Sequence, residues 1–284
     1  MLKRTTELAL KFTKMQGAGN DFVVFDNREY GLLLDEIIAI TPRLCHRRFG
    51  VGADGVLVLQ PSEKADYRMI YRNADGSDAG MCGNGGRCLA SFAVRAGFSP
   101  ELSFLVHGQT YRAQVEEGEE RVHVRFPVTP EASAPLEFYS RPALSVYSGT
   151  EHVVSWASPE VLDDEDRLRE EGAAIRYNQR MFPKGTNVNF IHPASDDGPI
   201  IMKTYERGVE DLTLACGTGA LASAVGHHHK SRGHQAGSFS YEVQCSGGTL
   251  QTSFTYDDEA KRYRELRLSG PVAFVFEGVY HIAP

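Results

Sequence analysis

The sequence predicts an α+β fold made of two duplicated domains. A cysteine on a glycine-rich turn occurs twice, because residues 81–90 read MCGNGGRCLA and residues 215–222 read ACGTGALA. Each phrase is typical of a turn that opens a helix. Short β-rich runs also outnumber the helical segments, which favours many antiparallel strands with a few helices. Two matched phrases in such a chain indicate a duplication that brings two thiols together.

The segments before the two cysteines repeat in the same order. Three pairs of segments match: residues 19–24 and 149–154, 49–54 and 182–187, and 71–73 and 205–207. The last pair precedes its cysteine by the same interval in both halves. Solenoid repeats span only tens of residues, so a repeat of this length indicates a duplicated domain.

Local patterns predict short strands and few helices along both halves. Runs rich in β-branched and aromatic residues predict strands at 22–25, 56–59, 67–71, 121–126, 188–191 and 200–205. Helices are expected at 35–44, 88–96, 161–171 and 219–225. The charged helix at 161–171 is expected on the surface, and the Pro/Ala-rich stretch at 127–135 is expected to mark a domain boundary.

Composition limits the class of protein. A chain of 284 residues with 42% hydrophobic content is long enough to bury two modest cores. The net charge of −7 argues against a general nucleic-acid binder, which needs a basic face. No apolar run reaches the length of about 18 residues that would predict a membrane span. The N-terminus lacks a secretion signal and five cysteines do not suit a secreted disulfide framework, so we expect a cytoplasmic protein.

The position of each cysteine predicts an activated thiol. Cys82 and Cys216 are expected at the first turn of a helix, where backbone N–H groups and the positive end of the helix dipole face outwards. This environment lowers a thiol pKa from about 8.5 toward neutrality. The glycines that follow let the backbone approach a ligand closely, so the same helix start is also suited to an anion.

Two matched thiols of this kind suit the inversion of a carbon centre. A thiolate takes the proton from Cα on one face, and the opposite thiol delivers a proton on the other face. The helix starts stabilise the charge that grows on a carboxylate as the proton leaves. The pattern therefore predicts a cofactor-free racemisation or epimerisation of an amino acid.

Other uses of cysteine fit less well. Zinc sites and redox pairs usually read C-x-x-C, and no such pair occurs here, so no metal is expected. A covalent thiol hydrolase needs one cysteine with a histidine, which would leave the second matched thiol idle. Cys45, Cys88 and Cys245 are interpreted as structural thiols.

Five segments resemble the diaminopimelate epimerase family. They are residues 16–22 (QGAGNDF), 72–77 (RNADGS), 82–88 (CGNGGRC), 205–208 (YERG) and 215–219 (ACGTG). The resemblance extends from about Lys14 to the C-terminus. It implies a PLP-independent isomerase that converts LL- to meso-2,6-diaminopimelate for lysine and peptidoglycan synthesis.

The resemblance also implies an organisation. Two pseudo-symmetric α/β domains are expected to place the active site in the cleft between them. The N-terminal half covers residues 1–129 and is completed by a C-terminal strand at 270–284, and residues 130–269 form the other half. The implied partner is a small-molecule substrate, no cofactor is implied, and a homodimer is expected.

The site residues are carried over by motif. Cys82 and Cys216 are the implied catalytic acid/base pair. Nine residues are implied to bind substrate: Asn20, Asn73, Gly83, Asn84, Asn187, Glu206, Arg207, Gly217 and Thr218. Arg207 is best suited to the distal carboxylate, since a guanidinium binds it through two hydrogen bonds. His152 and Glu206 are expected to tune the cysteines.

The chain departs from the family pattern in three places. Thr150 and Glu151 stand where the family commonly has Asn-Pro, so a distal substrate contact is expected to differ. Some members carry a glutamine where Gly55 stands, so Gly55 is not counted as a contact. The run at 227–229 is three histidines, which resembles a metal-binding tract but is interpreted as a solvated surface run.

Two alternative functions stay open. A proline or hydroxyproline racemase or epimerase uses the same two-cysteine plan, and Thr150 and Glu151 leave room for a different substrate. A carboxylate-binding protein without activity would need only the helix N–H groups, so the two thiols argue against it. A phenazine-type isomerase of similar fold is disfavoured because it would not need the cysteine pair.

Overall fold

The computed structural model describes residues 7–78, 80–118, 120–233 and 235–282. The chain divides into two compact units, one formed by Met1–Val124 with Gly270–Pro284 and the other by Arg125–Ser269. The sequence analysis placed the first boundary later, at residues 129 and 130. The outermost parts of the predicted N-terminal half, residues 1–6 and 283–284, lie outside the described residues.

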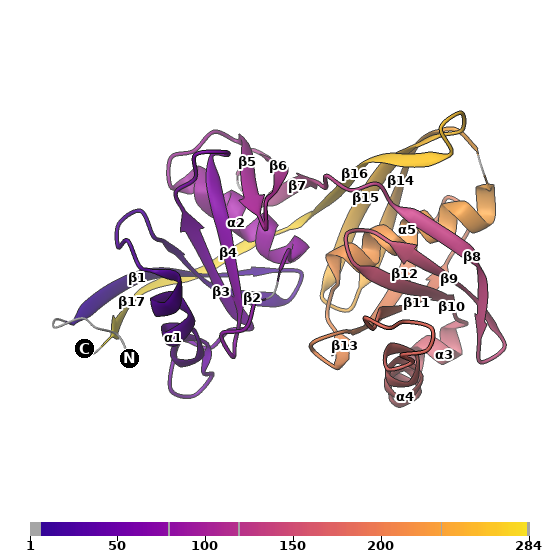
Figure 1. Ribbon diagram of the computed structural model, residues 1–284, viewed down its shortest axis with the longest axis horizontal. Coiled ribbons are helices and arrows are strands. Elements are labelled where there is room, and N and C mark those ends of the chain that lie inside the picture. The colour runs from indigo at the N-terminus through magenta and orange to yellow at the C-terminus, as the bar shows by residue number, and fades with distance from the viewer. Residues whose placement is uncertain (1–6, 79, 119, 234, 283–284) are drawn as a thin grey trace. The chain divides into compact units, whose positions relative to one another are not determined.

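The described residues of unit 1 form mostly strands, together with the helices α1 and α2 (Figure 1). Its elements are β1 (Leu8–Gly17), β2 (Asn20–Asp26), α1 (Leu34–Cys45), β3 (Gly55–Gln60), β4 (Tyr67–Asn73), α2 (Gly83–Arg95), β5 (Glu101–Val106), β6 (Gln109–Val115), β7 (Arg121–Arg125) and β17 (Ala273–Ile282). Strand β17 pairs antiparallel with β1. The end of the chain therefore completes the sheet that its beginning starts.

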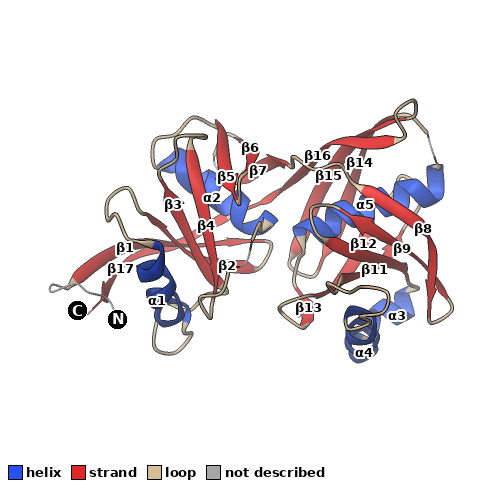
Figure 2. Cartoon of the chain, viewed as in Figure 1, coloured by secondary structure: helices blue, strands red, loops and turns tan. Residues whose placement is uncertain are grey.

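Unit 2 is also dominated by strands (Figure 2). Its elements are β8 (Glu131–Phe138), β9 (Arg141–Tyr147), β10 (Glu151–Trp156), α3 (Pro159–Asp163), α4 (Glu165–Arg176), β11 (Asn187–Pro193), β12 (Ile200–Glu206), β13 (Asp211–Thr213), α5 (Gly217–Arg232), β14 (Gly237–Cys245), β15 (Gly248–Asp257) and β16 (Arg262–Pro271). Strand β8 pairs with β9, as β17 pairs with β1.

The two units share one pattern of strand pairing. In unit 1, β1 to β6 pair consecutively as antiparallel, parallel, antiparallel, parallel and antiparallel. In unit 2, β9, β10, β11, β12, β14 and β15 pair in that same sequence of directions. Both parallel connections of each unit carry helices, as parallel pairing requires a crossover. The predicted α+β class and the predicted duplication are therefore confirmed.

Helices cover both faces of the sheet in unit 1. Side chains of α1, such as Ile37 and Ile40, pack in one core with Val56 and Val58 of β3. The intervening Leu57 reaches Gly85 of α2, because successive side chains of a strand point to opposite faces. The buried residues of β3 therefore pack against two helices, one on each face of the sheet.

Unit 2 repeats this layering. Helix α4 packs through Leu168 and Ile175 against Val188 and Phe190 of β11. Helix α5 covers the other face, where Gly226 approaches Val154 of β10. Small residues along α5 allow this contact, and the helix is buried on most of its sides.

The predicted elements are mostly present, but several boundaries were wrong. Each predicted strand overlaps an observed one, from β2 to β12. The helix expected at 161–171 is two helices, α3 and α4, because Asp164 caps the second by accepting the Arg167 N–H at 3.1 Å. The stretch expected to mark a boundary at 127–135 runs into strand β8.

The glycine-rich phrases are themselves helical. Helix α2 begins at Gly83, not at residue 88, and α5 begins at Gly217, not at residue 219. Each cysteine is therefore the N-cap residue that directly precedes its helix. Close packing on the sheet selects the glycines and outweighs their poor helix propensity.

The histidine run is also inside the fold. Helix α5 continues to Arg232, so the histidine run lies within the helix, and His227 and His228 are buried. His228 is surrounded by Phe239, Phe254 and two tyrosines. The expectation of a solvated surface run was therefore wrong for these two residues, since the run extends a buried helix and the rings fill its core.

Candidate active site

Cys82 caps helix α2 in unit 1. Its backbone is extended, and its Sγ accepts the Gly85 N–H at 3.3 Å. The first intrahelical bond runs from Gly86 N–H to Cys82 O at 2.8 Å. The N–H groups of Gly83 and Asn84 precede this bond, where a helix offers donors to an acceptor outside its ladder. Unit 1 therefore joins a half-buried sulfur to an anion-suited helix start.

Asn20 begins β2 and lies beside this sulfur. The Cys82 thiol donates to Asn20 Oδ1 at 3.6 Å. The amide nitrogen of Asn20 donates to Asp54 Oδ2 at 2.7 Å. Asn20 is thus an expected site residue that contacts Cys82, although the two lie 62 positions apart in the sequence.

A cluster of charged side chains joins the segments that contain Asn20 and Asp54. Arg47 donates to Asp21 at 2.9 Å and to Asp54 at 2.7 Å, and Lys14 donates to Asp21 at 2.6 Å. Burial alone would raise the pKa of Asp21, but hydrogen bonds from Arg47 and Lys14 outweigh it and lower the pKa to about 2. Asp21 is therefore ionised near neutral pH and anchors the loops that carry Asn20 and Asp54.

Cys216 caps helix α5 in unit 2 and is more deeply buried than Cys82. Its backbone is also extended. Within the described part of unit 2 its side chain makes no capping bond to α5, and its Sγ lies 3.7 Å from Thr218 Oγ1. Ser148 holds the first turn by donating to Thr218 O at 2.9 Å. The two cysteines thus share a position but differ in their partners.

Asn189 is a neighbour of Cys216 that the sequence analysis missed. A methyl group at Gly219 would lie 2.4 Å from Asn189 Oδ1 and 3.2 Å from Cys216 Sγ, so only glycine fits between them. Thr204 donates to the same Asn189 oxygen at 2.9 Å. The sequence did contain a sign of this role, because Asn189 is an amide inside the apolar run of β11. A buried polar side chain requires hydrogen-bond partners.

His152 lies in this network as a buried, neutral ring. Asn189 Nδ2 lies 3.1 Å from His152 Nδ1 and also donates to Val153 O at 3.2 Å. Burial, assisted by the charge of Arg207, lowers the pKa of His152 to about 3. His152 therefore accepts from Asn189 in its uncharged form.

Arg207 follows β12 and is held by its surroundings. Its guanidinium donates to Thr150 Oγ1 at 2.8 Å, to Glu151 Oε2 at 3.3 Å and to Lys184 O at 2.9 Å. Its backbone N–H donates to Asn187 Oδ1 at 2.9 Å. The two residues that depart from the family pattern therefore contact the arginine expected to bind a distal carboxylate.

The remaining expected residues are placed as follows. Asn73 ends β4 and its amide donates to Ser77 Oγ at 3.0 Å. Glu206 ends β12, directly before Arg207. Gly55 begins β3 opposite Asn73, and a methyl group there would lie 2.4 Å from Arg72 O. Of the expected asparagines, Asn20 contacts a cysteine, whereas the contacts of Asn73 and Asn187 are with Ser77 and with Glu151 and Arg207.

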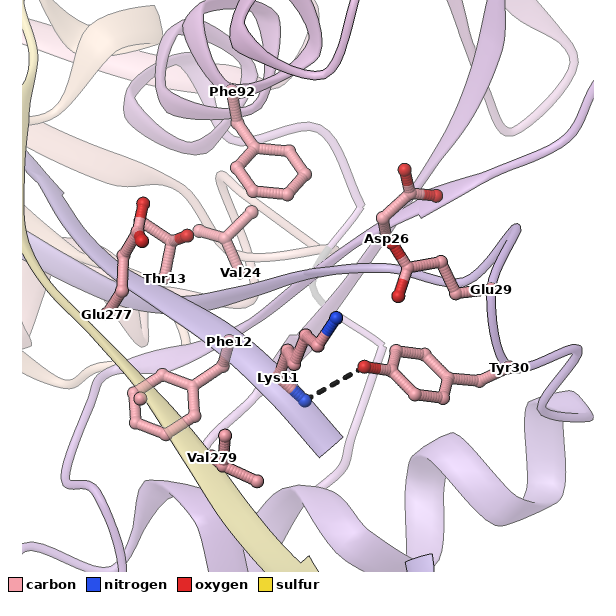
Figure 3. Close-up of a pocket in the computed structure, with 11 residues that line it drawn as sticks. Lys11, Phe12, Thr13, Val24, Asp26, Glu29, Tyr30, Phe92, Glu277 and Val279 are labelled. Carbon is pink, nitrogen blue, oxygen red and sulfur yellow. Dashed lines mark hydrogen bonds between the residues drawn. The ribbon is translucent and has the colours of Figure 1, made fainter. Parts of the chain in front are cut away.

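A cavity of about 460 Å³ also lies in unit 1 (Figure 3). Lys11, Phe12, Tyr30, Phe92 and other residues of β1, β2, α2 and β17 line it. None of the expected site residues is among its lining. The cavity is therefore separate from the surroundings of Cys82.

The described residues were also compared with the requirements of a metal site and of a membrane-spanning helix, and they meet neither. Among residues 7–78, 80–118, 120–233 and 235–282, no group of three or more His, Cys, Asp or Glu side chains is arranged to hold a metal ion. Over that same part of the chain, no helix has the length and apolar character needed to cross a membrane.

Comparisons with known proteins agree on one family. The family model described as diaminopimelate epimerase matches residues 12–126 and 144–274. The diaminopimelate epimerase of Chlorobaculum tepidum is 39% identical, over 93% of this chain and 98% of the relative. That of Flavobacterium psychrophilum is 35% identical, over 94% of this chain and 99% of the relative.

Solved structures with low sequence identity share the fold. A phenazine biosynthesis protein of Bacillus anthracis superposes with a TM-score of 0.75 at 15% identity, over 97% of this chain and 100% of that one. A hydroxyproline epimerase of Agrobacterium vitis superposes with a TM-score of 0.70 at 16% identity, over 96% and 91%.

Proposed function

The chain belongs to the diaminopimelate epimerase family, and on that premise we propose that it interconverts LL- and meso-2,6-diaminopimelate. The observation that carries the proposal is the pair of helix starts, each with a cysteine at the N-cap. Inversion of Cα requires an acid and a base on opposite faces, and two matched thiols supply both. The proposed place of the reaction in metabolism is lysine and peptidoglycan synthesis.

The proposed chemistry uses side chains and backbone only. One cysteine, as thiolate, takes the proton from Cα, and the other, as thiol, gives its proton to the opposite face. The N–H groups of Gly83, Asn84, Gly217 and Thr218 are proposed to bind the carboxylate beside the reacting carbon. Fixed donors of this kind stabilise the charge that develops as the proton leaves. This route needs no cofactor.

The rest of the substrate is assigned to polar side chains of both units. Asn20, Asn73, Asn187 and Glu206 are proposed to bind the amino and carboxylate groups, and Arg207 the distal carboxylate. The guanidinium already contacts Glu151 and Thr150, so the substrate carboxylate has to displace or share these partners. His152 is proposed to tune Cys216 by holding Asn189 beside it.

The test of the reaction is direct. Purified protein is incubated with LL-diaminopimelate, and the meso isomer is followed by chiral chromatography. L-Proline and trans-4-hydroxy-L-proline are incubated in parallel. The proposal predicts turnover of diaminopimelate alone. Turnover of an imino acid without turnover of diaminopimelate would replace it with the racemase alternative.

The proposal extends to assembly and location. A cytoplasmic homodimer is proposed from the family resemblance. Val275 and Val279 expose apolar surface on the same face of β17, because their positions differ by an even number of residues, and this face is offered to a second copy. Sedimentation of the wild-type protein and of Val279→Glu tests the dimer. A dimer that persists unchanged in the variant would place the interface elsewhere, and a wild-type monomer would remove the homodimer.

A further inference from the structure

Asn20 connects the Cys82 thiol to a carboxylate that lies outside the proposed reaction. Its Oδ1 accepts from Cys82 at 3.6 Å, and its Nδ2 donates to Asp54 Oδ2 at 2.7 Å. Asp54 is exposed, and its side chain has no assigned part in substrate binding. The amide therefore separates two groups with different hydrogen-bonding capacity.

The chemistry of these groups fixes the direction of the amide. An ionised carboxylate only accepts hydrogen bonds, whereas an amide has one accepting end and one donating end. Asp54 therefore selects the orientation in which the NH₂ group faces it. The oxygen is then turned toward Cys82, where it accepts from a thiol but repels a thiolate.

We propose that Asp54 is a positioning residue that acts through Asn20 to keep Cys82 in its protonated form in the resting enzyme. The inference deepens the proposed function and rests on the proposed role of Cys82. This form enters the direction of turnover in which Cys82 donates the proton and Cys216 acts as the base. In that turnover the Cα–H bond breaks toward Cys216 and the S–H proton of Cys82 passes to Cα.

The position of Asp54 is itself fixed. Its second oxygen accepts from Arg47 at 2.7 Å, and Oδ2 also accepts the Asp21 N–H at 3.2 Å. Arg47 and Lys14 in turn bind Asp21. The carboxylate is thus oriented by Arg47, in the loop after α1, and by Asp21 of β2, and it cannot rotate away from Asn20 without losing these donors.

Other groups near Cys82 act in different directions. Gly85 N–H donates to the sulfur and favours the thiolate, as does the start of helix α2. Arg87 of α2 is buried and donates to Asn84 Oδ1 at 2.9 Å, which adds positive charge to the same helix turn. Cys88 lies one turn further along and is also buried. Asp21 and Asp54 carry two negative charges and Arg47 and Lys14 two positive ones, so the charges offset one another in their cluster.

The contacts of Cys216 in unit 2 differ from those of Cys82. Cys216 Sγ is near the Thr218 hydroxyl, which can either donate or accept. Asn189, the nearby amide, points its oxygen at Thr204 and its nitrogen at His152. The two thiols are therefore not interchangeable in the resting protein.

The test measures the thiol itself and not the reaction. Alkylation of Cys82 by iodoacetamide is followed against pH, because only the thiolate reacts appreciably. Mass spectrometry reads Cys82 separately from Cys88, since trypsin cleaves after Arg87 between them. Failure of the inference is thus distinguishable from failure of the proposed function.

A double-mutant cycle separates orientation from charge. Asp54→Asn presents a donor to Asn20 and lets the amide turn, so the pH midpoint of alkylation should fall by about half to one unit, the size of one net hydrogen bond. In an Asn20→Ala background the same change should have no effect, because nothing is left to orient. Asp54→Ser should act like Asp54→Asn and serves if that variant does not fold.

Two results would overturn the inference. An equal shift with and without Asn20 would mean that Asp54 acts by its charge alone. An unchanged or raised midpoint in both Asp54→Asn and Asp54→Ser would mean that it does not act on Cys82. Asp26→Asn is the matched control, because it removes a carboxylate of the same unit that pairs with Arg28 and not with Asn20; its midpoint should match the wild type.

Discussion

Helices α2 and α5 begin in the same way, yet the side chains around their two cysteines differ. In unit 1, Cys82 accepts from the helix and donates to Asn20. In unit 2, Cys216 is packed against Thr218 and a buried network that contains Asn189. The comparison indicates that the duplication preserved the helix start, while the side chains that contact each thiol diverged.

The difference continues away from the sulfurs. Charged side chains anchor the loop of unit 1, with Asp21 at the centre of two ion pairs. In unit 2, the network beside Cys216 contains His152, which is buried without charge. His228, further along α5, is also buried without charge. The two halves should therefore respond differently to substitution and to acid.

The largest expected effect is the loss of either thiol. Cys82→Ala and Cys216→Ala should each lower kcat/KM by at least about 100-fold, which is the lower end of the range of general acid/base catalysis. The remaining thiol cannot exchange a proton with the opposite face of Cα. Circular dichroism should show an unchanged fold. Cys88→Ala is the matched control, since Cys88 lies in α2 but not at its start, and it should retain activity. Wild-type turnover in either helix-start variant would remove that thiol from the mechanism.

The glycines that follow the cysteines should differ between the halves. A methyl group at Gly219 meets Asn189 Oδ1 at 2.4 Å, whereas one at Gly85 meets the end of Leu57 at 3.0 Å. Gly219→Ala should lower the free energy of unfolding by about 1–3 kcal/mol through overpacking and should also reduce activity. Gly85→Ala should be nearly neutral, because alanine gains about 1 kcal/mol of helix propensity. Urea unfolding of both variants checks this; equal effects would contradict the difference in packing.

Acid should destabilise the protein through the buried histidines of unit 2. Burial lowers the pKa of His228 to about 4, so its unfolded form, with a pKa near 6.5, binds the proton more readily. The stabilisation is complete above about pH 6.5 and is lost as the pH falls toward about 4. Each such histidine adds a slope of up to about 1.4 kcal/mol per pH unit.

His228→Phe should remove one part of that slope. Phenylalanine suits the surrounding rings of Phe239, Phe254, Tyr256 and Tyr263. The free energy of unfolding is measured by urea titration at several pH values between the two limits. His229→Gln, at the partly exposed neighbour, should keep the wild-type slope. If both variants keep it, His228 does not titrate in this window.

The smallest expected effect concerns Glu151. Its carboxylate is a partly exposed partner of Arg207 at 3.3 Å, so it competes with a distal substrate carboxylate. Glu151→Gln should lower KM for diaminopimelate about two- to fivefold, as expected for an exposed ion pair, with kcat unchanged. Glu160→Gln, an exposed glutamate of the same unit, should change neither. A raised KM in Glu151→Gln would show that Glu151 assists binding instead.

Local signals were sufficient for much of the fold. The β-rich runs at 56–59 and 188–191 are the centres of β3 and β11, because strands buried on both faces read as continuous apolar segments. The first residues of α2 and α5 were harder to predict from the sequence. Glycine has a poor helix propensity, and only packing against Leu57 and Asn189 explains why these turns are helical.

The site was predictable where a motif repeats and not where a contact spans the chain. The two cysteine phrases indicated both helix starts. Asp54, Arg47 and Asn189 were missed because their roles come from pairings such as Asn20 with Asp54, which no local pattern shows. His227 and His228 looked like a surface tract, since burial of a polar run depends on the aromatic side chains of distant strands.

The central claim is that two thiols exchange protons with one Cα from opposite faces. Epimerisation of LL-diaminopimelate in deuterated water, stopped at low conversion, tests it most directly. The account predicts that newly formed meso product carries one solvent deuterium at the inverted carbon while recovered substrate carries almost none. Equal label in both, or product that retains its original proton, would mean that a single base serves both faces.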